Sequence, residues 1–301
     1  MGSGVYSSAT YSALYNDRGY TDARPEELFK NRGITFANDI SNSNIDARQY
    51  NKVNKEMQSI GVRECRDSQE HPNTTPIIIA LDVTGSMGRI PDQLLRKGFP
   101  RLMNALLEVG IPDPQLLFMA IGDHKYDDAP IQVGQFESDT EKIVNMLQDF
   151  YIEGGGGGNF GESYLLAYLM AGYHTETDSW FKRHKKGYLF TMGDEPDHTR
   201  LESRYLKSLG YEDGIQEMSE QTLLEKAQEQ YNVFHIHIKD GSYGIADGHW
   251  QDLLGDHLLT SHSSDVDKVI AKTIIEFMGK PQAKPEIKFE SSRPQVNLEI
   301  L

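Results

Sequence analysis

PIIIALDVTGS, residues Pro76–Ser86, contains the most informative pattern in this chain. A nearly continuous apolar run that ends in an acidic residue is typical of a strand buried on both faces of a parallel sheet. Asp82, Thr84 and Ser86 then follow at alternate positions on a turn that leads toward a helix. They offer three oxygen atoms in one direction, and hard divalent cations prefer oxygen ligands. The stretch therefore predicts a central strand with a metal site at its carboxyl end.

Similar apolar runs alternate with helical patterns along the rest of the chain. Strands are predicted at Leu116–Gly122, Tyr188–Met192 and Val233–Ile238, with an edge strand at Pro130–Phe136 and a last strand at Leu258–Thr260. Helices are predicted at Pro91–Gly110 with a break at Gly98 and Pro100, and at Asp139–Phe150, Glu162–Gly172, Leu201–Leu209, Ser219–Gln230 and Asp265–Met278. The alternation predicts a three-layer, Rossmann-like α/β fold with a mostly parallel sheet and helices on both faces.

The composition excludes several classes of protein. The 301 residues include 30 Lys and Arg against 45 Asp and Glu, a net charge of −15, which argues against a nucleic-acid binder and favours a metal or a basic protein surface. No apolar run approaches the roughly 20 residues of a membrane span. A single cysteine, Cys65, and an N-terminus without an apolar signal segment lead us to expect a cytoplasmic protein.

The acidity is concentrated in the later part of the chain. Residues 1–75 carry a net charge of −1, and the remaining residues carry −14. We therefore predict an extended N-terminal arm (1–74), with a short helix at Ile45–Ile60, an α/β domain (75–280) and an irregular tail (281–301) that could add one edge strand. The tyrosines of the arm suggest that it packs against the domain or against another subunit, which allows self-association.

Two further segments lie near the predicted metal site. Gly193-Asp194-Glu195 follows the strand at Tyr188–Met192 and adds a second carboxylate, because the carboxyl ends of parallel strands share one edge of the sheet. Gly154–Ser163 is a glycine-rich loop that leads into the apolar helix at Glu162–Gly172. Glycines permit the close backbone approach that such a loop needs. The order of these three loops is the main functional signal of the sequence.

An apolar strand ending in Asp-x-Thr-x-Ser, a later glycine-rich loop and a strand ending in Gly-Asp-Glu resemble the von Willebrand factor A (VWA) family, of the bacterial or phage type. The resemblance covers about residues 75–280 and implies a six-stranded sheet with a metal-ion-dependent adhesion site (MIDAS). It implies that the ligands are Asp82, Thr84, Ser86, Asn159 and Asp194, where Thr84 stands for the usual serine and Asn159 for the usual threonine. Glu162 and Ser163 are alternatives to Asn159.

The resemblance also implies a function without catalysis. The ion would be Mg²⁺, with Mn²⁺ or Ca²⁺ as substitutes, and an acidic side chain of a partner protein would fill its open coordination position. Gly158, Glu162, Asp123 and Glu195 are expected to border the partner. Some members of the family work beside AAA+ ATPases or in stress and conflict systems, so such an ATPase is a candidate partner.

The sequence also allows other interpretations. The Asp82 turn could be only a helix N-cap. Asp82 could instead be the nucleophile of a haloacid-dehalogenase-type phosphohydrolase, although the second acid of that chemistry is replaced by Thr84.

Further interpretations concern two histidines of a strand and two acidic residues near the predicted metal site. His235 and His237 face the same way on a strand and could bind zinc, but we expect buried, hydrogen-bonded histidines. Asp123 belongs to an acidic cluster that either borders the metal site or closes a loop, and Glu195 is expected to be solvated or to start a helix.

Overall fold

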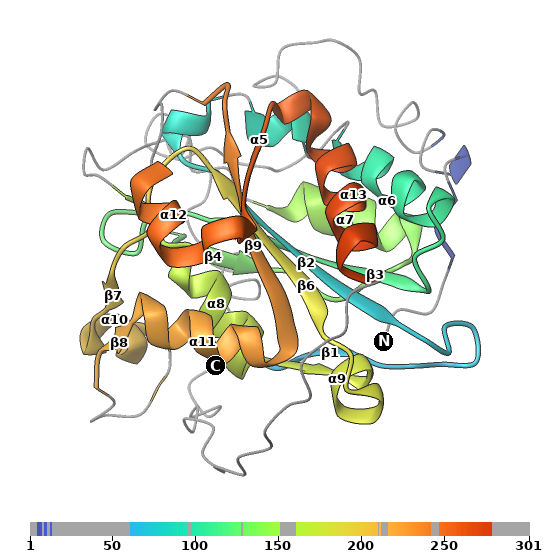
Figure 1. Cartoon of the computed structure of the whole chain (residues 1–301), viewed down its shortest axis with the longest axis horizontal. Coiled ribbons are helices and arrows are strands. Elements are labelled where there is room, and N and C mark those ends of the chain that lie inside the picture. The colour runs from blue at the N-terminus through green and yellow to red at the C-terminus, as the bar shows by residue number, and fades with distance from the viewer. Residues whose placement is uncertain are drawn as a thin grey trace, which may run out of the picture.

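A six-stranded sheet forms the centre of the molecule (Figure 1). The computed structural model describes residues 5–7, 9–10, 13, 61–88, 90–94, 98–127, 129–150, 161–209, 211, 216–241 and 247–278. In spatial order the strands are β10 (Leu258–Ser261), β9 (Tyr231–Ile238), β6 (Gly187–Gly193), β2 (Thr75–Asp82), β3 (Pro114–Ile121) and β4 (Ile131–Val133). All neighbours are parallel except β3 and the edge strand β4. Each of the six predicted strands is confirmed.

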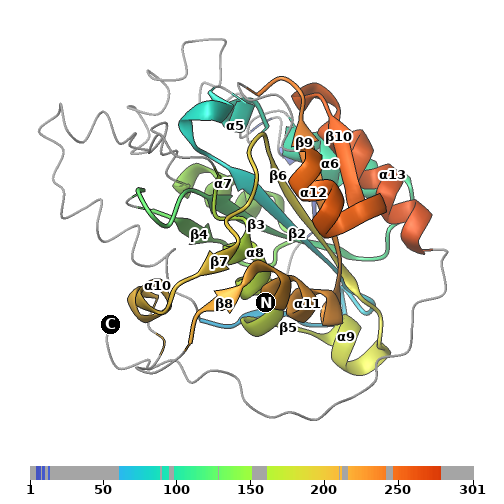
Figure 2. The ribbon, with the colours of Figure 1, turned by 60° about the vertical axis from the view of Figure 1, so that its left-hand side comes forward.

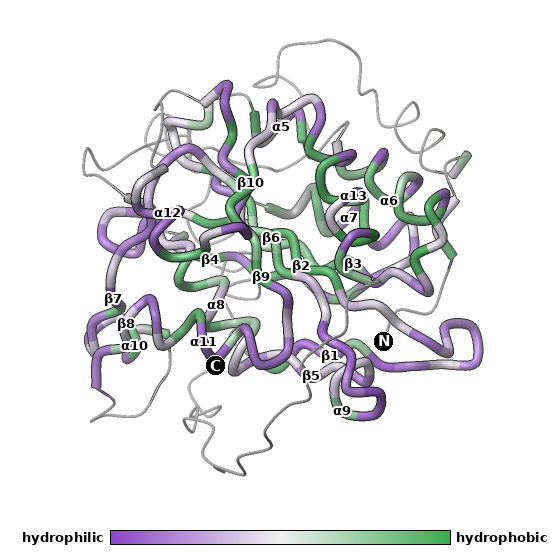
Figure 3. Tube along the Cα trace, viewed as in Figure 1, coloured by the Kyte–Doolittle hydropathy of each residue, from purple (hydrophilic) through white to green (hydrophobic). Residues whose placement is uncertain are grey.

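Helices cover both faces of this sheet, so the three-layer α/β prediction is confirmed (Figures 1 and 2). One face carries α6 (Phe99–Glu108), α7 (Thr140–Asp149) and α13 (Val266–Met278). The other carries α8 (Leu165–Tyr173), α10 (Ser203–Ser208), α11 (Glu220–Gln230) and α12 (Asp247–Leu254). Alternate residues of each central strand point into the two apolar cores, since Ile77 and Ile79 contact the first layer and Ile78 the second. Hydropathy follows the same plan, with apolar strands inside and polar loops around them (Figure 3).

Local sequence signals explain where several helices begin. The side chain of Asp139 accepts hydrogen bonds from the backbone N–H groups of Glu141 and Lys142 and so caps α7. Ser219 caps α11 in the same way, through the N–H of Thr222. Two helices lie on either side of the expected break, α5 (Ile90–Gln93) and α6, which has a proline in its first turn, and residues 95–97 between them lie outside the described residues.

Several short elements were not predicted. β1 (Arg63–Cys65) pairs in parallel with β5 (Thr175–Thr177), and β7 (Arg200–Leu201) pairs with β8 (Met218–Ser219). The other short elements are α9 (Asp178–Arg183), α12 and three short 3-10 segments, at Gly85–Met87, Gly255–His257 and Ser263–Asp265. Because Cys65 is buried in the second core, residues just before the predicted domain boundary pack on the α/β unit. The predicted helix at 45–60 and the tail lie outside the described residues.

The strand order places a topological switch point between β2 and β6. The chain continues from β2 to its neighbour β3 on one side, and from β6 to β9 on the other. Ligands of open α/β sheets bind outside the carboxyl ends of strands at such a point. Pairing of Leu81 with Met192 brings Asp82, the last residue of β2, to the level of the end of β6. Within the described residues, no helix is long and apolar enough to cross a membrane.

Candidate metal centre

The turn after β2 holds three oxygen-bearing side chains in one network. The Thr84 hydroxyl and backbone N–H donate to Oδ1 of Asp82 at 2.6 and 2.8 Å. The Thr84 and Ser86 hydroxyl oxygens are 3.3 Å apart. An aspartate that accepts a bond from the backbone two residues on closes a tight local turn. The turn therefore orients Asp82, Thr84 and Ser86 together, as their spacing in the sequence predicts.

The loop after β6 completes the group with Asp194. The Ser86 hydroxyl donates to Oδ1 of Asp194 at 2.7 Å, although the two residues are far apart in the sequence. Two glycines make room for this contact. A Cβ on Gly193 would lie 2.8 Å from Oδ2 of Asp82, and a Cβ on Gly241 would lie 2.5 Å from Oδ2 of Asp194. These backbone positions thus leave space for the two carboxylates.

The segment leading into α8 closes the third side. The hydroxyl of Tyr164 donates to Oδ2 of Asp82 at 2.9 Å, so both carboxylate oxygens of Asp82 are held. Gly161 has a φ of 107°, which favours glycine, and its N–H donates to Oε2 of Glu195 at 2.9 Å. Oε2 of the buried Glu162 has no hydrogen-bond partner among the described residues.

Burial and mutual repulsion raise the pKa values of the acids in this region. Burial, with a smaller contribution from the charge of Asp194, raises the pKa of Asp82 to about 7. Burial followed by the charges of Asp82, Glu195 and Asp123 raises the pKa of Glu162 to about 11. Such a concentration of buried carboxyl groups is stabilised by a bound cation, which becomes the dominant local charge.

The structure thus brings Asp82, Thr84, Ser86 and Asp194 together at the end of β2 and β6. Asn159 and Gly158 lie outside the described residues, so their predicted roles stay predictions. The hydroxyl of Ser163, an alternative to Asn159, is instead 2.6 Å from Nδ1 of His124 and accepts from the His124 N–H.

Glu195 corrects one expectation. Its side chain is neither solvated nor at a helix start, because it is buried and bound to the backbone of Gly161. Its backbone carbonyl also accepts a hydrogen bond from the buried indole of Trp250 at 3.0 Å. The segment after Asp194 is therefore held in place beside the candidate metal centre.

Asp123 closes its own loop and also contacts a histidine. Its Oδ1 accepts from the N–H of Lys125 at 2.9 Å, while its own N–H donates to Asp127. The same Oδ1 lies 2.9 Å from Nε2 of His198, in the loop after β6. Burial, followed by the nearby His198, lowers the pKa of His124 to about 4.

Sequence reasoning missed three residues of this region: His124, His198 and Tyr164. The two histidines follow the carboxyl ends of β3 and β6, a signal that could have identified them.

The histidines of β9 are buried, as we expected. The ring of His235 stacks on Trp250 with centroids 3.6 Å apart, and its Nδ1 lies 2.9 Å from the Thr191 hydroxyl. Burial, and to a lesser degree the neighbouring His237, lowers the pKa of His235 well below its usual value. Nδ1 of His237 has no hydrogen-bond partner among the described residues, so the expected hydrogen bond is found only for His235.

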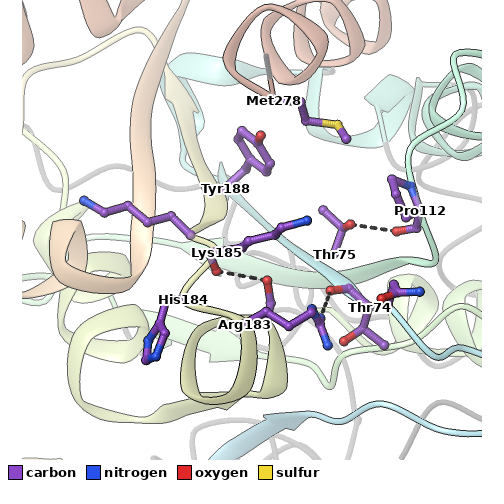
Figure 4. A pocket seen from close by; sticks show the side chains of 11 residues that line it. Thr74, Thr75, Pro112, Arg183, His184, Lys185, Tyr188 and Met278 are labelled. Carbon is purple, nitrogen blue, oxygen red and sulfur yellow. Dashed lines mark hydrogen bonds between the residues drawn. The ribbon is translucent and has the colours of Figure 1, made fainter. Parts of the chain in front are cut away.

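A separate cavity of about 410 Å³ lies at the opposite end of the sheet (Figure 4). It is lined by residues at the starts of β2 and β6 and at the end of α13, among them Thr75, Tyr188 and Met278. Arg183 and Lys185 give it basic character, in contrast to the acidic centre. The cavity and the candidate metal centre are therefore distinct features.

Comparisons with known proteins give only distant likenesses. No family model matches the sequence, and no curated protein matches it. Solved structures of similar fold include mussel proximal thread matrix protein 1 with a zinc occupied MIDAS motif (14% identity, 72% of this chain and 49% of that one, TM-score 0.46). A second is the SpRpn10 VWA domain (13% identity, 65% of this chain and 93% of that one, TM-score 0.40). A third is the vWF domain of the type V pili tip protein Mfa5 from Porphyromonas gingivalis (11% identity, 74% of this chain and 98% of that one, TM-score 0.43). The present chain spans about half of the mussel protein.

Proposed function

We propose that this chain is a VWA-type domain that binds Mg²⁺ through Asp82, Thr84, Ser86 and Asp194 and uses the ion to dock a carboxylate of a partner protein. One observation carries the proposal. Two hydroxyls and two carboxylates from two different loops form one hydrogen-bonded group at the switch point of the sheet. All the candidate metal ligands are oxygen atoms, which suits Mg²⁺ and, with looser geometry, Mn²⁺ or Ca²⁺.

The residues fit such an ion in charge and in space. The raised pKa of Asp82 reflects a buried carboxylate that lacks a positive neighbour, and a divalent cation offsets this cost. Gly193 and Gly241 leave space where any side chain would press on the two carboxylates. The ion would supply an electrostatic anchor for an acidic side chain of the partner.

The protein's own residues orient the ligands for this task. Thr84 and Tyr164 each hold one oxygen atom of Asp82, so its carboxylate plane is fixed before any partner arrives. Ser86 joins the first loop to Asp194 on the third. A preorganised site of this kind lowers the cost of ordering when a partner binds.

Hydrolysis of phosphoesters is less well supported. A haloacid-dehalogenase-type enzyme needs an acid two residues after the nucleophile, to donate and accept protons. Here that position is Thr84, whose hydroxyl is already committed to Asp82 at 2.6 Å. We therefore favour docking over catalysis, with an AAA+ ATPase as one candidate partner and self-association through the arm as another.

Isothermal titration of the metal-free chain with Mg²⁺ tests the proposal. Asp82→Asn keeps the volume of the side chain but removes its charge, and we expect Mg²⁺ affinity to fall at least about a hundredfold with the circular dichroism spectrum unchanged. The exposed Asp252→Asn is the matched control and should bind like the wild type. Unchanged Mg²⁺ binding by Asp82→Asn would overturn the assignment.

A second experiment tests the partner chemistry. A chain loaded with Mg²⁺ should bind a glutamate-containing peptide and not the same peptide with glutamine. Size-exclusion chromatography of the full chain and of a chain that starts at Gly61, which keeps β1, tests self-association through the arm. Equal elution as monomers would contradict the assembly role and leave the docking role intact.

A further inference from the structure

We propose that Asp123, His124 and His198 form a second metal site, for a divalent transition metal such as Zn²⁺, separate from the Asp82 centre. The three residues come from two loops that follow the carboxyl ends of β3 and β6. One ligand atom from each lies within 4.8 Å of the other two. The site goes beyond the proposed Mg²⁺ function and does not depend on it.

The geometry of the three side chains suits a compact ion. Oδ1 of Asp123 is 2.9 Å from Nε2 of His198, and the rings of His124 and His198 meet edge to face with centroids 5.0 Å apart. All three residues are buried, each with at most 6% of its surface exposed. Buried groups of this kind differ from the exposed acidic clusters that are common on protein surfaces.

The donor set separates this site from the Asp82 centre. Imidazole nitrogen favours borderline metals such as Zn²⁺, whereas Mg²⁺ selects oxygen ligands. Two imidazoles and one carboxylate leave a fourth tetrahedral position, which is typical of zinc sites that keep one position open. The two sites should therefore select different ions from a mixture.

Surrounding contacts support the arrangement. Nδ1 of His124 is 2.6 Å from the Ser163 hydroxyl, and metal-bound histidines usually have such a partner on the second nitrogen. The carboxyl of Glu162 is influenced by the charges of Asp123 and Asp127 and of Asp82. Its Oε2 is buried without a partner among the described residues. The carboxyl groups of this region therefore repel one another, and a second cation would reduce that repulsion.

Two groups compete with the metal: Oε2 of Glu202, which is 3.3 Å from Nε2 of His124, and the ammonium group of Lys125. Nζ of Lys125 lies 3.1 Å from Nδ1 of His198, and an ammonium group can only donate, so the ring proton is on Nε2 and points to Asp123. Coordination through Nε2 needs that proton on Nδ1 and Lys125 turned away. Lys125 is exposed and can move into solvent.

Isothermal titration with ZnCl₂ in excess Mg²⁺, on tag-free full-length protein stripped of metals, tests this site. We expect one Zn²⁺ per chain, and His124→Ala and His198→Ala should each weaken binding by at least about tenfold. His262→Ala, at an exposed histidine, is the matched control. Asp82→Asn should lose Mg²⁺ affinity and keep Zn²⁺ binding, which separates the failure of one site from that of the other.

Lys125→Met keeps the test valid if the histidine variants unfold. Because it removes a competing cation from an exposed position, it should fold normally and bind Zn²⁺ several-fold more tightly. The d–d spectrum of bound Co²⁺ should show nitrogen ligands in a tetrahedral site. Three outcomes would overturn the proposal: no zinc binding, unchanged binding in His198→Ala, or loss of binding only in His237→Ala. If no zinc binds, Asp123, His124 and His198 form only a hydrogen-bond network.

Discussion

The hydroxyl of Tyr164 donates a 2.9 Å hydrogen bond to Oδ2 of Asp82, between two fully buried side chains. Tyr164 precedes α8, on one face of the sheet, whereas Asp82 ends the central strand β2. The bond therefore connects the apolar core under α8 with the candidate metal centre. It also explains why Gly193 is needed, since a Cβ at that position would collide with the Tyr164 hydroxyl.

Tyr164→Phe should lower the free energy of unfolding by about 1–3 kcal/mol, because it leaves a buried carboxylate oxygen without its donor. Tyr168→Phe, one turn further along and equally buried, is the matched control. Its hydroxyl has no hydrogen-bond partner among the described residues, so its removal should change stability little. Urea unfolding of both variants measures the difference, and equal losses would show that the Tyr164 bond contributes nothing specific.

Gly193→Ala should weaken Mg²⁺ binding at least about tenfold, because the new Cβ would lie 1.8 Å from the Tyr164 hydroxyl oxygen and 2.8 Å from Oδ2 of Asp82, and would displace both groups. Gly248→Ala is the control, since nothing lies within 4 Å of a Cβ added there in α12. That change should leave Mg²⁺ affinity unaltered and stabilise the helix by up to about 1 kcal/mol. Calorimetric titration of both variants makes the comparison.

The stability of the metal-free protein should fall as pH rises from about 5 to 8. Burial and the neighbouring carboxylates raise the folded-state pKa of Glu162 to about 11, while the unfolded chain loses this proton near its ordinary pKa. The folded state therefore holds more protons, and one such group lowers the unfolding free energy by up to about 1.4 kcal/mol per pH unit. The stabilisation that this proton gives is complete at low pH and is lost as the pH approaches the folded-state pKa of Glu162.

Glu162→Gln isolates this effect, because glutamine does not titrate. In EDTA, the variant should be the more stable protein at pH 8, and its advantage should shrink toward pH 5. Glu225→Gln, at an exposed position of α11, should follow the wild-type curve. Parallel curves for Glu162→Gln and the wild type would show that Glu162 does not carry the pH dependence.

The sequence predicts the central sheet well because each strand has a local signature. The apolar runs of β2, β3 and β9 are long enough to identify without knowledge of their neighbours. The pair β1 and β5 could not be found in the same way, since three residues each carry no periodicity and their pairing is a long-range contact.

The residues of the candidate metal centre also fall into two groups, those that local sequence patterns predict and those that depend on long-range packing. Asp82, Thr84 and Ser86 follow from spacing within one turn, and Asp194 follows from the rule that ligands gather at carboxyl ends of strands. Tyr164 and the burial of Glu195 depend on how α8 and Trp250 pack, which no local pattern encodes. The basic cavity near Arg183 likewise forms from segments distant in the sequence.

Phosphoester hydrolysis gives a direct test between the two functions weighed from the sequence. With Mg²⁺ present, we expect turnover of p-nitrophenyl phosphate to stay below about 1 s⁻¹, because no acid stands two residues after Asp82. Thr84→Asp places an acid at that position, so this variant tests whether the missing acid limits hydrolysis. Turnover above this rate in the wild type that is lost in Asp82→Asn would favour the enzyme.

A chain that starts at Thr75 should be less stable than one that starts at Gly61, although the predicted domain boundary lies at residue 75. The missing segment contains Cys65, buried in the second core, and Arg63, whose Nε donates to the carbonyl of Gly134 at 2.8 Å. It also contains Asp67, which pairs with Arg183.

Loss of these contacts should lower the unfolding free energy by at least about 2 kcal/mol, given one buried apolar side chain and a charged hydrogen bond. Urea unfolding of the two truncated chains measures this difference in unfolding free energy. Arg63→Met in the longer chain shows how much of the difference comes from the Arg63 side chain. If the two chains unfold at the same urea concentration, β1 is dispensable and the α/β unit begins at β2, as the change in charge along the sequence predicts.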